Sequence, residues 1–126
     1  MPSPADPDVA AKRVARLLLA ALFAAAGVFH FTHTADFAAL IAWLPAPGAI
    51  VWATGAVELL LAAALLTARW RKAAGVALAL YALAVLPANI AMALDPALHR
   101  GFPEWALWLR VVLQAPLVAL ILWASR

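Results

Sequence analysis

Long apolar runs alternate with short polar connections along the chain, and this pattern predicts four membrane-spanning helices. A transmembrane helix needs about 20 predominantly apolar residues. Runs of this kind occupy residues 14–31, 49–68, 73–94 and 104–124. The basic turn at residues 69–72 is too short to connect its two helices in any way but an antiparallel hairpin. The sequence therefore predicts an all-α fold, an integral membrane four-helix bundle with antiparallel, up-down topology.

The segments outside the runs are rich in proline and charge. Residues 1–11 hold three prolines and two aspartates and no apolar run, so we expect a disordered N-terminal tail before one domain at residues 12–126. Residues 32–47 form the first connection. The first run could also be a signal peptide cleaved near Ala24–Ala26, but it continues through Phe29, which favours an uncleaved helix.

Composition supports the membrane interpretation and narrows the chemistry. The 126 residues are 68% hydrophobic and 12% charged, and the mean hydropathy is +0.98. A soluble domain has roughly 45–50% apolar and 25% charged residues, so a water-soluble globule is excluded. The chain has no cysteine, which excludes disulfides, thiol catalysis and cysteine-ligated iron–sulfur clusters.

The basic residues predict the orientation, because cytoplasmic connections retain positive charge. In the predicted topology Arg100 lies on the outer side and Arg110 lies inside a span. The other basic residues all lie on the opposite side: Lys12, Arg13, Arg16, Arg69, Arg71, Lys72 and Arg126. Both termini are therefore expected in the cytoplasm. The pI of about 10.2 indicates contact with the lipid bilayer and its headgroups, and no nucleic-acid partner is expected.

Five polar residues within or at the ends of the spans share the outer half of the predicted membrane: His30, Glu58, Asn89, Arg110 and Gln114. A charge at the bilayer centre costs about 2.5–3.5 kcal/mol on insertion scales, so Glu58 and Arg110 are expected to point inward and pair. Two interpretations remain open. The pair is a structural bridge whose spare groups Asn89 and Gln114 satisfy, or the five residues line a ligand-binding site that opens to the outer face.

Other candidate chemistry is weaker. Pro87 leaves the Leu83 carbonyl without its helical partner, which marks either a cavity or a packing kink. Tyr81 lies two turns from Asn89 on the same face and either extends the polar path or, as is favoured, is an ordinary aromatic residue whose hydroxyl bonds locally. The histidines lack the spacing of a ligand set, so no metal or haem is expected. No catalytic motif is present, and whether the chain is an enzyme stays open.

Several segments together resemble the DoxX-like family of small bacterial membrane proteins over residues 26 to about 124. These segments are Ala26–Phe31 (AGVFHF), Leu44–Pro45, Gly55–Leu59 (GAVEL), Pro87–Met92 (PANIAM) and Leu109–Gln114 (LRVVLQ). The chain departs from the family pattern at Val112, where a proline is frequent, and at Ala91, where a histidine or aromatic residue is frequent.

The resemblance implies a four-helix bundle in the cytoplasmic membrane of a bacterium. The family is named after a subunit associated with a terminal quinol oxidase and thiosulfate:quinone oxidoreduction, and some similar proteins are linked to oxidative-stress complexes. It therefore implies an accessory or binding subunit of a quinone-linked redox or stress-response system, with a membrane oxidoreductase as partner and a quinone as candidate ligand. The alternatives are an assembly factor for a larger membrane protein and a small-solute permease that acts as a homo-oligomer.

Overall fold

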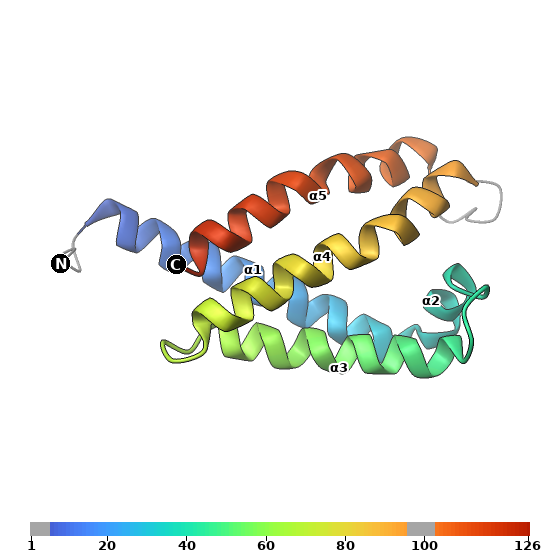
Figure 1. Cartoon of the computed structure of the whole chain (residues 1–126), viewed down its shortest axis with the longest axis horizontal. Coiled ribbons are helices and arrows are strands. Elements are labelled where there is room, and N and C mark those ends of the chain that lie inside the picture. The colour runs from blue at the N-terminus through green and yellow to red at the C-terminus, as the bar shows by residue number, and fades with distance from the viewer. Residues whose placement is uncertain (1–5, 96–102) are drawn as a thin grey trace.

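The computed structural model describes residues 6–95 and 103–126, and these residues form five helices and no strand. The helices are α1 (Pro7–Thr32), α2 (Thr34–Leu40), α3 (Pro47–Leu65), α4 (Arg71–Leu94) and α5 (Glu104–Ala124). All except α2 are long and apolar enough to cross a membrane. The prediction of an all-helical chain with four candidate spans is confirmed, and the four helices indicate a multi-pass membrane protein (Figure 1).

The first helix begins earlier than predicted. The Asp6 side chain accepts a hydrogen bond of 2.9 Å from the Asp8 backbone N–H, and Pro7 occupies the first turn. An N-cap aspartate followed by proline is a helix start signal. Proline fixes a helical φ, and the N–H that it lacks would have no hydrogen-bond partner in the first turn of a helix. Residues 7–11 are therefore helical, and their assignment to a disordered tail was wrong. Residues 1–5 lie outside the described residues.

The connection predicted at residues 32–47 contains the short helix α2. The Thr34 hydroxyl donates to the His30 carbonyl at 2.8 Å and accepts from Trp52 Nε1 at 3.2 Å, so the start of α2 is tied to α1 and α3. Leu40, the last residue of α2, packs against the C-terminal end of α4 and the N-terminal end of α5. The other boundaries shift by a few residues, the largest shift being the end of α3 at Leu65.

The helices associate most extensively in two pairs, α1 with α3 and α4 with α5. Glycines permit the first pairing: a Cβ added to Gly27 would lie 2.9 Å from the Gly55 carbonyl oxygen, and one added to Gly55 would lie 3.1 Å from the Gly27 carbonyl oxygen. The two backbones therefore approach so closely that a side chain at either position would push α1 and α3 apart.

Two hydrophobic cores join the pairs. The larger core contains residues of α1, α3, α4 and α5: Leu19, Ala20, Phe23, Ala62, Leu65, Ala74, Leu78, Ala79, Ile121 and Ala124. The smaller core contains Met92, Ala93 and Leu107, with Leu40 and Val111 packed against it. The larger core lies toward one end of α3, α4 and α5 and near the middle of α1, while the smaller core lies toward the other end of α4 and α5. This arrangement leaves a middle zone between the cores.

The larger core lies near what we call the basic end, formed by residues 12–16, 66–72 and 124–126. Figure 1 shows the α3–α4 turn and the C-terminal end of α5 at this end, and α2 at the opposite end. Arg16 Nη1 donates to the Ala124 carbonyl at 2.9 Å, which ties α1 to the end of α5. Exposed tryptophans occur toward both ends, among them Trp43 and Trp105 near α2 and Trp70 at the basic end, as expected for a membrane interface.

Gly75 provides a test of the packing at the basic end. A Cβ at this position would overlap Ser125, with its Oγ at 1.9 Å and its Cβ at 2.2 Å. We expect Gly75→Ala to lower the free energy of unfolding by about 1 kcal/mol, because Ser125 must move but lies past the last residue of α5, where the backbone can shift without separating two helices. Thermal unfolding in detergent measures the change.

The control is the same substitution in a Ser125→Gly background. Removing the serine side chain leaves the Ile121 carbonyl, at 3.7 Å, as the nearest remaining atom, so Gly75→Ala should then cost little. An equal loss in both backgrounds would show that the contact with Ser125 does not limit residue 75.

Candidate functional site

The close approach of α1 and α3 brings His30 and Glu58 together. His30 lies three residues after Gly27, and Glu58 lies three residues after Gly55, so each polar side chain follows its glycine by about one helical turn. His30 Nε2 lies 3.9 Å from Glu58 Oε1. Glu58 is 4% exposed, and its carboxylate lies in the middle zone between the two cores.

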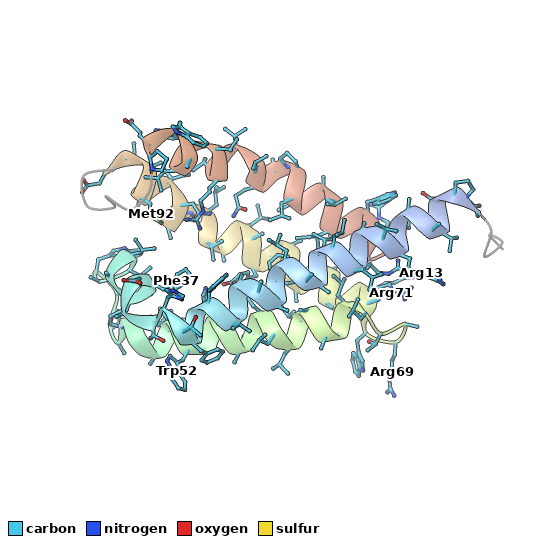
Figure 2. The ribbon with its side chains drawn as sticks, turned by 180° about the vertical axis from the view of Figure 1, so that it is seen from behind. Arg13, Phe37, Trp52, Arg69, Arg71 and Met92 are labelled. Atoms are coloured by element: carbon cyan, nitrogen blue, oxygen red, sulfur yellow. The ribbon has the colours of Figure 1, made fainter. Side chains whose placement is uncertain are left out.

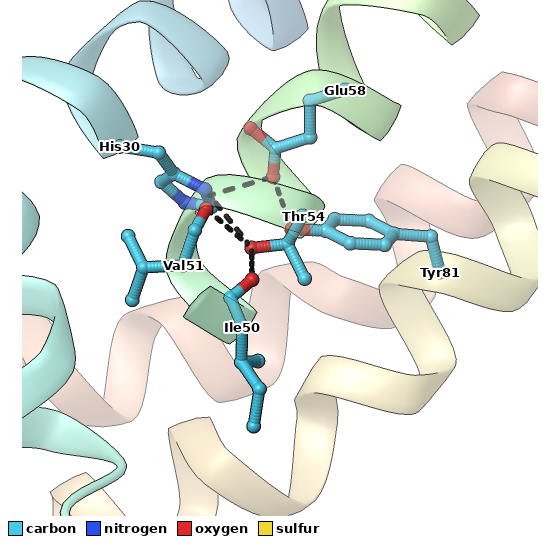
Figure 3. A network of polar contacts seen from close by, with 6 residues as sticks. All are labelled: His30, Ile50, Val51, Thr54, Glu58 and Tyr81. Atoms are coloured by element: carbon cyan, nitrogen blue, oxygen red, sulfur yellow. Dashed lines mark hydrogen bonds and ion pairs between the residues drawn. The ribbon is translucent and has the colours of Figure 1, made fainter. Parts of the chain in front are cut away.

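The closest partner of Glu58 comes from α4. The Tyr81 hydroxyl donates a short hydrogen bond to Glu58 Oε1 (Figure 3). The interpretation of Tyr81 as an ordinary aromatic residue with a local bond was therefore wrong. Tyr81 joins α4 to the α1–α3 pair through a polar contact, and the sequence signal for it was its place two helical turns from Asn89.

Thr54 completes what we call the Glu58 network: His30, Thr54, Glu58 and Tyr81. The Thr54 hydroxyl lies 2.9 Å from the Ile50 carbonyl, 3.0 Å from the Val51 carbonyl and 3.2 Å from His30 Nδ1 (Figure 3). A hydroxyl has one hydrogen, so either the Thr54 hydroxyl donates to a backbone carbonyl and His30 Nδ1–H donates to Thr54 Oγ1, or the hydroxyl donates to His30 Nδ1.

The choice between these two arrangements determines whether His30 Nε2 faces Glu58 with a hydrogen. With a hydrogen on Nδ1, a neutral ring turns the lone pair of Nε2 toward the carboxylate, and the two groups repel. The contact is attractive when Nε2 also carries a proton, and the 3.9 Å separation is longer than a direct hydrogen bond. The network is thus sensitive to where one proton resides.

Glu58 also retains an unused acceptor. Its Oε2 atom is buried and has no hydrogen-bond partner among the residues that the structure describes. A buried polar atom without a partner costs about 1–3 kcal/mol, and more when the group is charged. The structure therefore presents a buried acceptor that an incoming hydrogen-bond donor would satisfy.

The predicted bridge between Glu58 and Arg110 is absent from the described residues. Arg110 is exposed and forms no ion pair within this part of the chain. The reason lies in the helix arrangement: α5 packs mainly on α4 and less on α1, while Glu58 belongs to α3. The prediction that Glu58 and Arg110 pair was wrong, because the sequence did not indicate which helices are neighbours.

Asn89 and Gln114 are both 8% exposed, but neither is bonded to Glu58. Gln114 Nε2 instead donates to the Ala82 carbonyl of α4 at 2.9 Å. That carbonyl is next to the Leu83 carbonyl, which Pro87 leaves without its helical partner. Gln114 therefore stabilises the α4–α5 pair near the proline, which is a structural role the sequence did not predict.

The apolar grooves of the structure lie away from the Glu58 network. One groove is formed by α1 and α5 and another by α1 and α3, and none of the five predicted site residues lines either of them. Within residues 6–95 and 103–126 no group of three or more histidine, aspartate or glutamate side chains could hold a metal ion. His33 bonds the neighbouring Thr32 hydroxyl at 2.8 Å. His99 lies outside the described residues.

Comparison with known proteins matches the chain to a protein family. The model of a family described as a domain of unknown function, DUF8561, matches residues 19–126, which include the whole Glu58 network. No curated protein and no solved structure matches the chain significantly.

Proposed function

The chain belongs to the DUF8561 family of domains of unknown function, and we propose that it is a membrane-embedded binding subunit that holds a small amphiphile at the Glu58 network. The observation that carries this proposal is the buried Glu58 Oε2 atom without a hydrogen-bond partner among the described residues. Tyr81 and His30 both approach the other oxygen, Oε1, so the free acceptor suits a ligand and is not needed for the network itself.

The free acceptor determines the chemistry of the ligand. A carboxylate oxygen accepts hydrogen bonds and does not donate them, so the complementary group is a hydroxyl or an N–H. A quinol offers a hydroxyl to Glu58, whereas the carbonyl of the oxidised quinone does not. The resemblance to the DoxX-like family favours a ligand of the quinone and quinol class, bound in its hydroxyl-bearing form.

The proposed topology is an antiparallel bundle in a bacterial cytoplasmic membrane, with both termini in the cytoplasm. It is supported by the basic residues that gather at the basic end, since positive residues remain cytoplasmic. Glu58 then lies toward the outer side of the larger core. The chain has no cysteine to hold an iron–sulfur cluster, so a partner oxidoreductase would exchange electrons with the bound amphiphile.

The test is mass spectrometry of solvent extracts from the purified protein and from Glu58→Gln. Glutamine keeps the size of the side chain and removes the charge, so we expect an enriched hydroxyl-bearing amphiphile to fall at least about tenfold, as for a lost hydrogen bond to a charged group. The matched control is Asp95→Asn, which makes the same chemical change at an exposed carboxylate.

The outcomes separate the proposal from its main alternative. A small molecule enriched with the wild type and Asp95→Asn, and depleted with Glu58→Gln, supports a binding site. If no molecule is enriched but a partner chain co-purifies equally with all three forms, the network is structural and the protein is better understood as an assembly factor for a larger membrane protein.

A further inference from the structure

A second polar site lies at the basic end, away from the Glu58 network. Arg16 is 8% exposed although it carries a guanidinium group with five N–H donors. Within residues 6–95 and 103–126 it has one hydrogen-bond acceptor, the Ala124 carbonyl at 2.9 Å. A buried arginine normally bonds a carboxylate or phosphate in addition to a carbonyl, because one neutral acceptor does not compensate the lost hydration of the charge.

Arg71, the first residue of α4, is also incompletely bonded. Its Nε atom is buried and has no hydrogen-bond partner among the described residues. Arg71 lies one helical turn before Gly75, which lies against Ser125. Arg16 bonds the adjacent Ala124, so both arginines lie where α1, α4 and the end of α5 meet. Arg13 lies three residues before Arg16, about one turn away on α1. Figure 2 shows Arg13 and Arg71 at this same end of the helices.

Nothing in the described residues neutralises these three charges. The ion pairs found there join Lys12 to Asp8 at 3.5 Å and His30 to Glu58, and neither includes an arginine. The helices that hold the group are fixed in place, since Gly75 lies against Ser125 and Arg16 bonds the end of α5. The arginines are thus held where these helices meet, with no acidic side chain of the described residues paired to them.

We propose that Arg13, Arg16 and Arg71 form a binding site for the phosphate group of an anionic phospholipid. Arg71 Nε and the free N–H groups of Arg16 would donate to the phosphate oxygens, while Arg13 adds charge. Guanidinium groups bind phosphate through two parallel hydrogen bonds, which gives them strength and directional preference.

The position favours a lipid over a phosphate from solution. The site lies where α3 ends, α4 begins and α5 ends, and these helices are long and apolar enough to cross a membrane, so this is the depth of the lipid headgroups. Trp70 is exposed at this end, and the Lys12 ammonium lies 5.8 Å from the Trp123 ring. Tryptophan and lysine at the end of a span are typical of the headgroup region.

The test is native mass spectrometry of detergent-purified protein mixed with phosphatidylglycerol or phosphatidylcholine. The variant is Arg71→Gln, and the matched control is Arg69→Gln, which removes the same charge from an exposed side chain two residues away. We expect the wild type and Arg69→Gln to retain one phosphatidylglycerol in preference to phosphatidylcholine. Arg71→Gln should retain it about tenfold less, as for a lost charge-assisted hydrogen bond.

Equal losses in Arg69→Gln and Arg71→Gln would overturn the proposal, because the attraction would then be a diffuse effect of net charge. No preference of the wild type for phosphatidylglycerol over phosphatidylcholine, together with no binding of inorganic phosphate, would overturn it as well. Binding of inorganic phosphate alone, lost in Arg71→Gln, would support the phosphate site and refute its assignment to a lipid.

Arg71→Lys is a second variant, which separates a loss of lipid binding from a folding defect. Lysine keeps the positive charge but lacks the Nε donor and the planar fork of arginine. A variant that unfolds like the wild type yet retains less phosphatidylglycerol supports the proposal. Full retention by Arg71→Lys would contradict a role for the buried Nε atom.

Discussion

Gly55→Ala is expected to lower the free energy of unfolding by about 2–3 kcal/mol, near the upper end of the range for overpacked interiors. The added Cβ would lie 2.7 Å from His30 Cβ, 3.1 Å from the Gly27 carbonyl oxygen and 3.1 Å from Phe31. One of these atoms belongs to the backbone and another is anchored directly to it, so neither can move without separating α1 from α3. The same movement would pull His30 away from Glu58.

Gly48→Ala is the matched control for this substitution. Gly48 lies in the first turn of the same helix, and a Cβ added there has no atom within 4 Å. Alanine should be neutral or stabilise by up to about 0.5–1 kcal/mol, because it loses less backbone entropy than glycine on forming a helix. Thermal and chemical unfolding in detergent would compare the two variants, and equal stability would show that α1 and α3 are not held at glycine contact.

Part of the fold could be predicted from the sequence alone. Hydropathy alone located four spans, because a backbone in the bilayer must satisfy its own hydrogen bonds and therefore forms helices of a set length. It also placed His30 and Glu58 at compatible depths. The helix α2 escaped prediction, since a seven-residue helix has too few residues for a periodic hydrophobic signal.

The predictions for the site were wrong where they depended on which helices are neighbours. Charge pairing suggested that Glu58 and Arg110 meet, but pairing by charge assumes that any two helices can be neighbours. In the structure α4 packs on both α3 and α5, and it supplies Tyr81 to Glu58 and a backbone carbonyl to Gln114. Which helices are adjacent depends on small-residue contacts such as Gly27 with Gly55, and no single residue pattern along one helix specifies its neighbour.

Tyr81→Phe should reveal how strongly this α4 contact holds the Glu58 network. Hydrogen bonds between membrane helices average about 0.6 kcal/mol and reach about 1.7 kcal/mol. We expect Tyr81→Phe to cost about 1.5 kcal/mol, near the maximum, because the acceptor is a buried carboxylate and charge-assisted bonds are about twice as strong as neutral ones. The unfolding free energy in detergent gives the value.

The double variant Glu58→Met/Tyr81→Phe distinguishes a structural network from a functional one. Removing one member leaves a buried polar group without its partner, whereas replacing both by apolar side chains of similar size is nearly neutral or stabilising. We therefore expect the double variant to be more stable than either single variant, yet to retain no hydroxyl-bearing amphiphile in its extract. If the double variant is less stable than both single variants, the polar contacts are required for the fold, and the case for Glu58 as a ligand-binding carboxylate loses its main support.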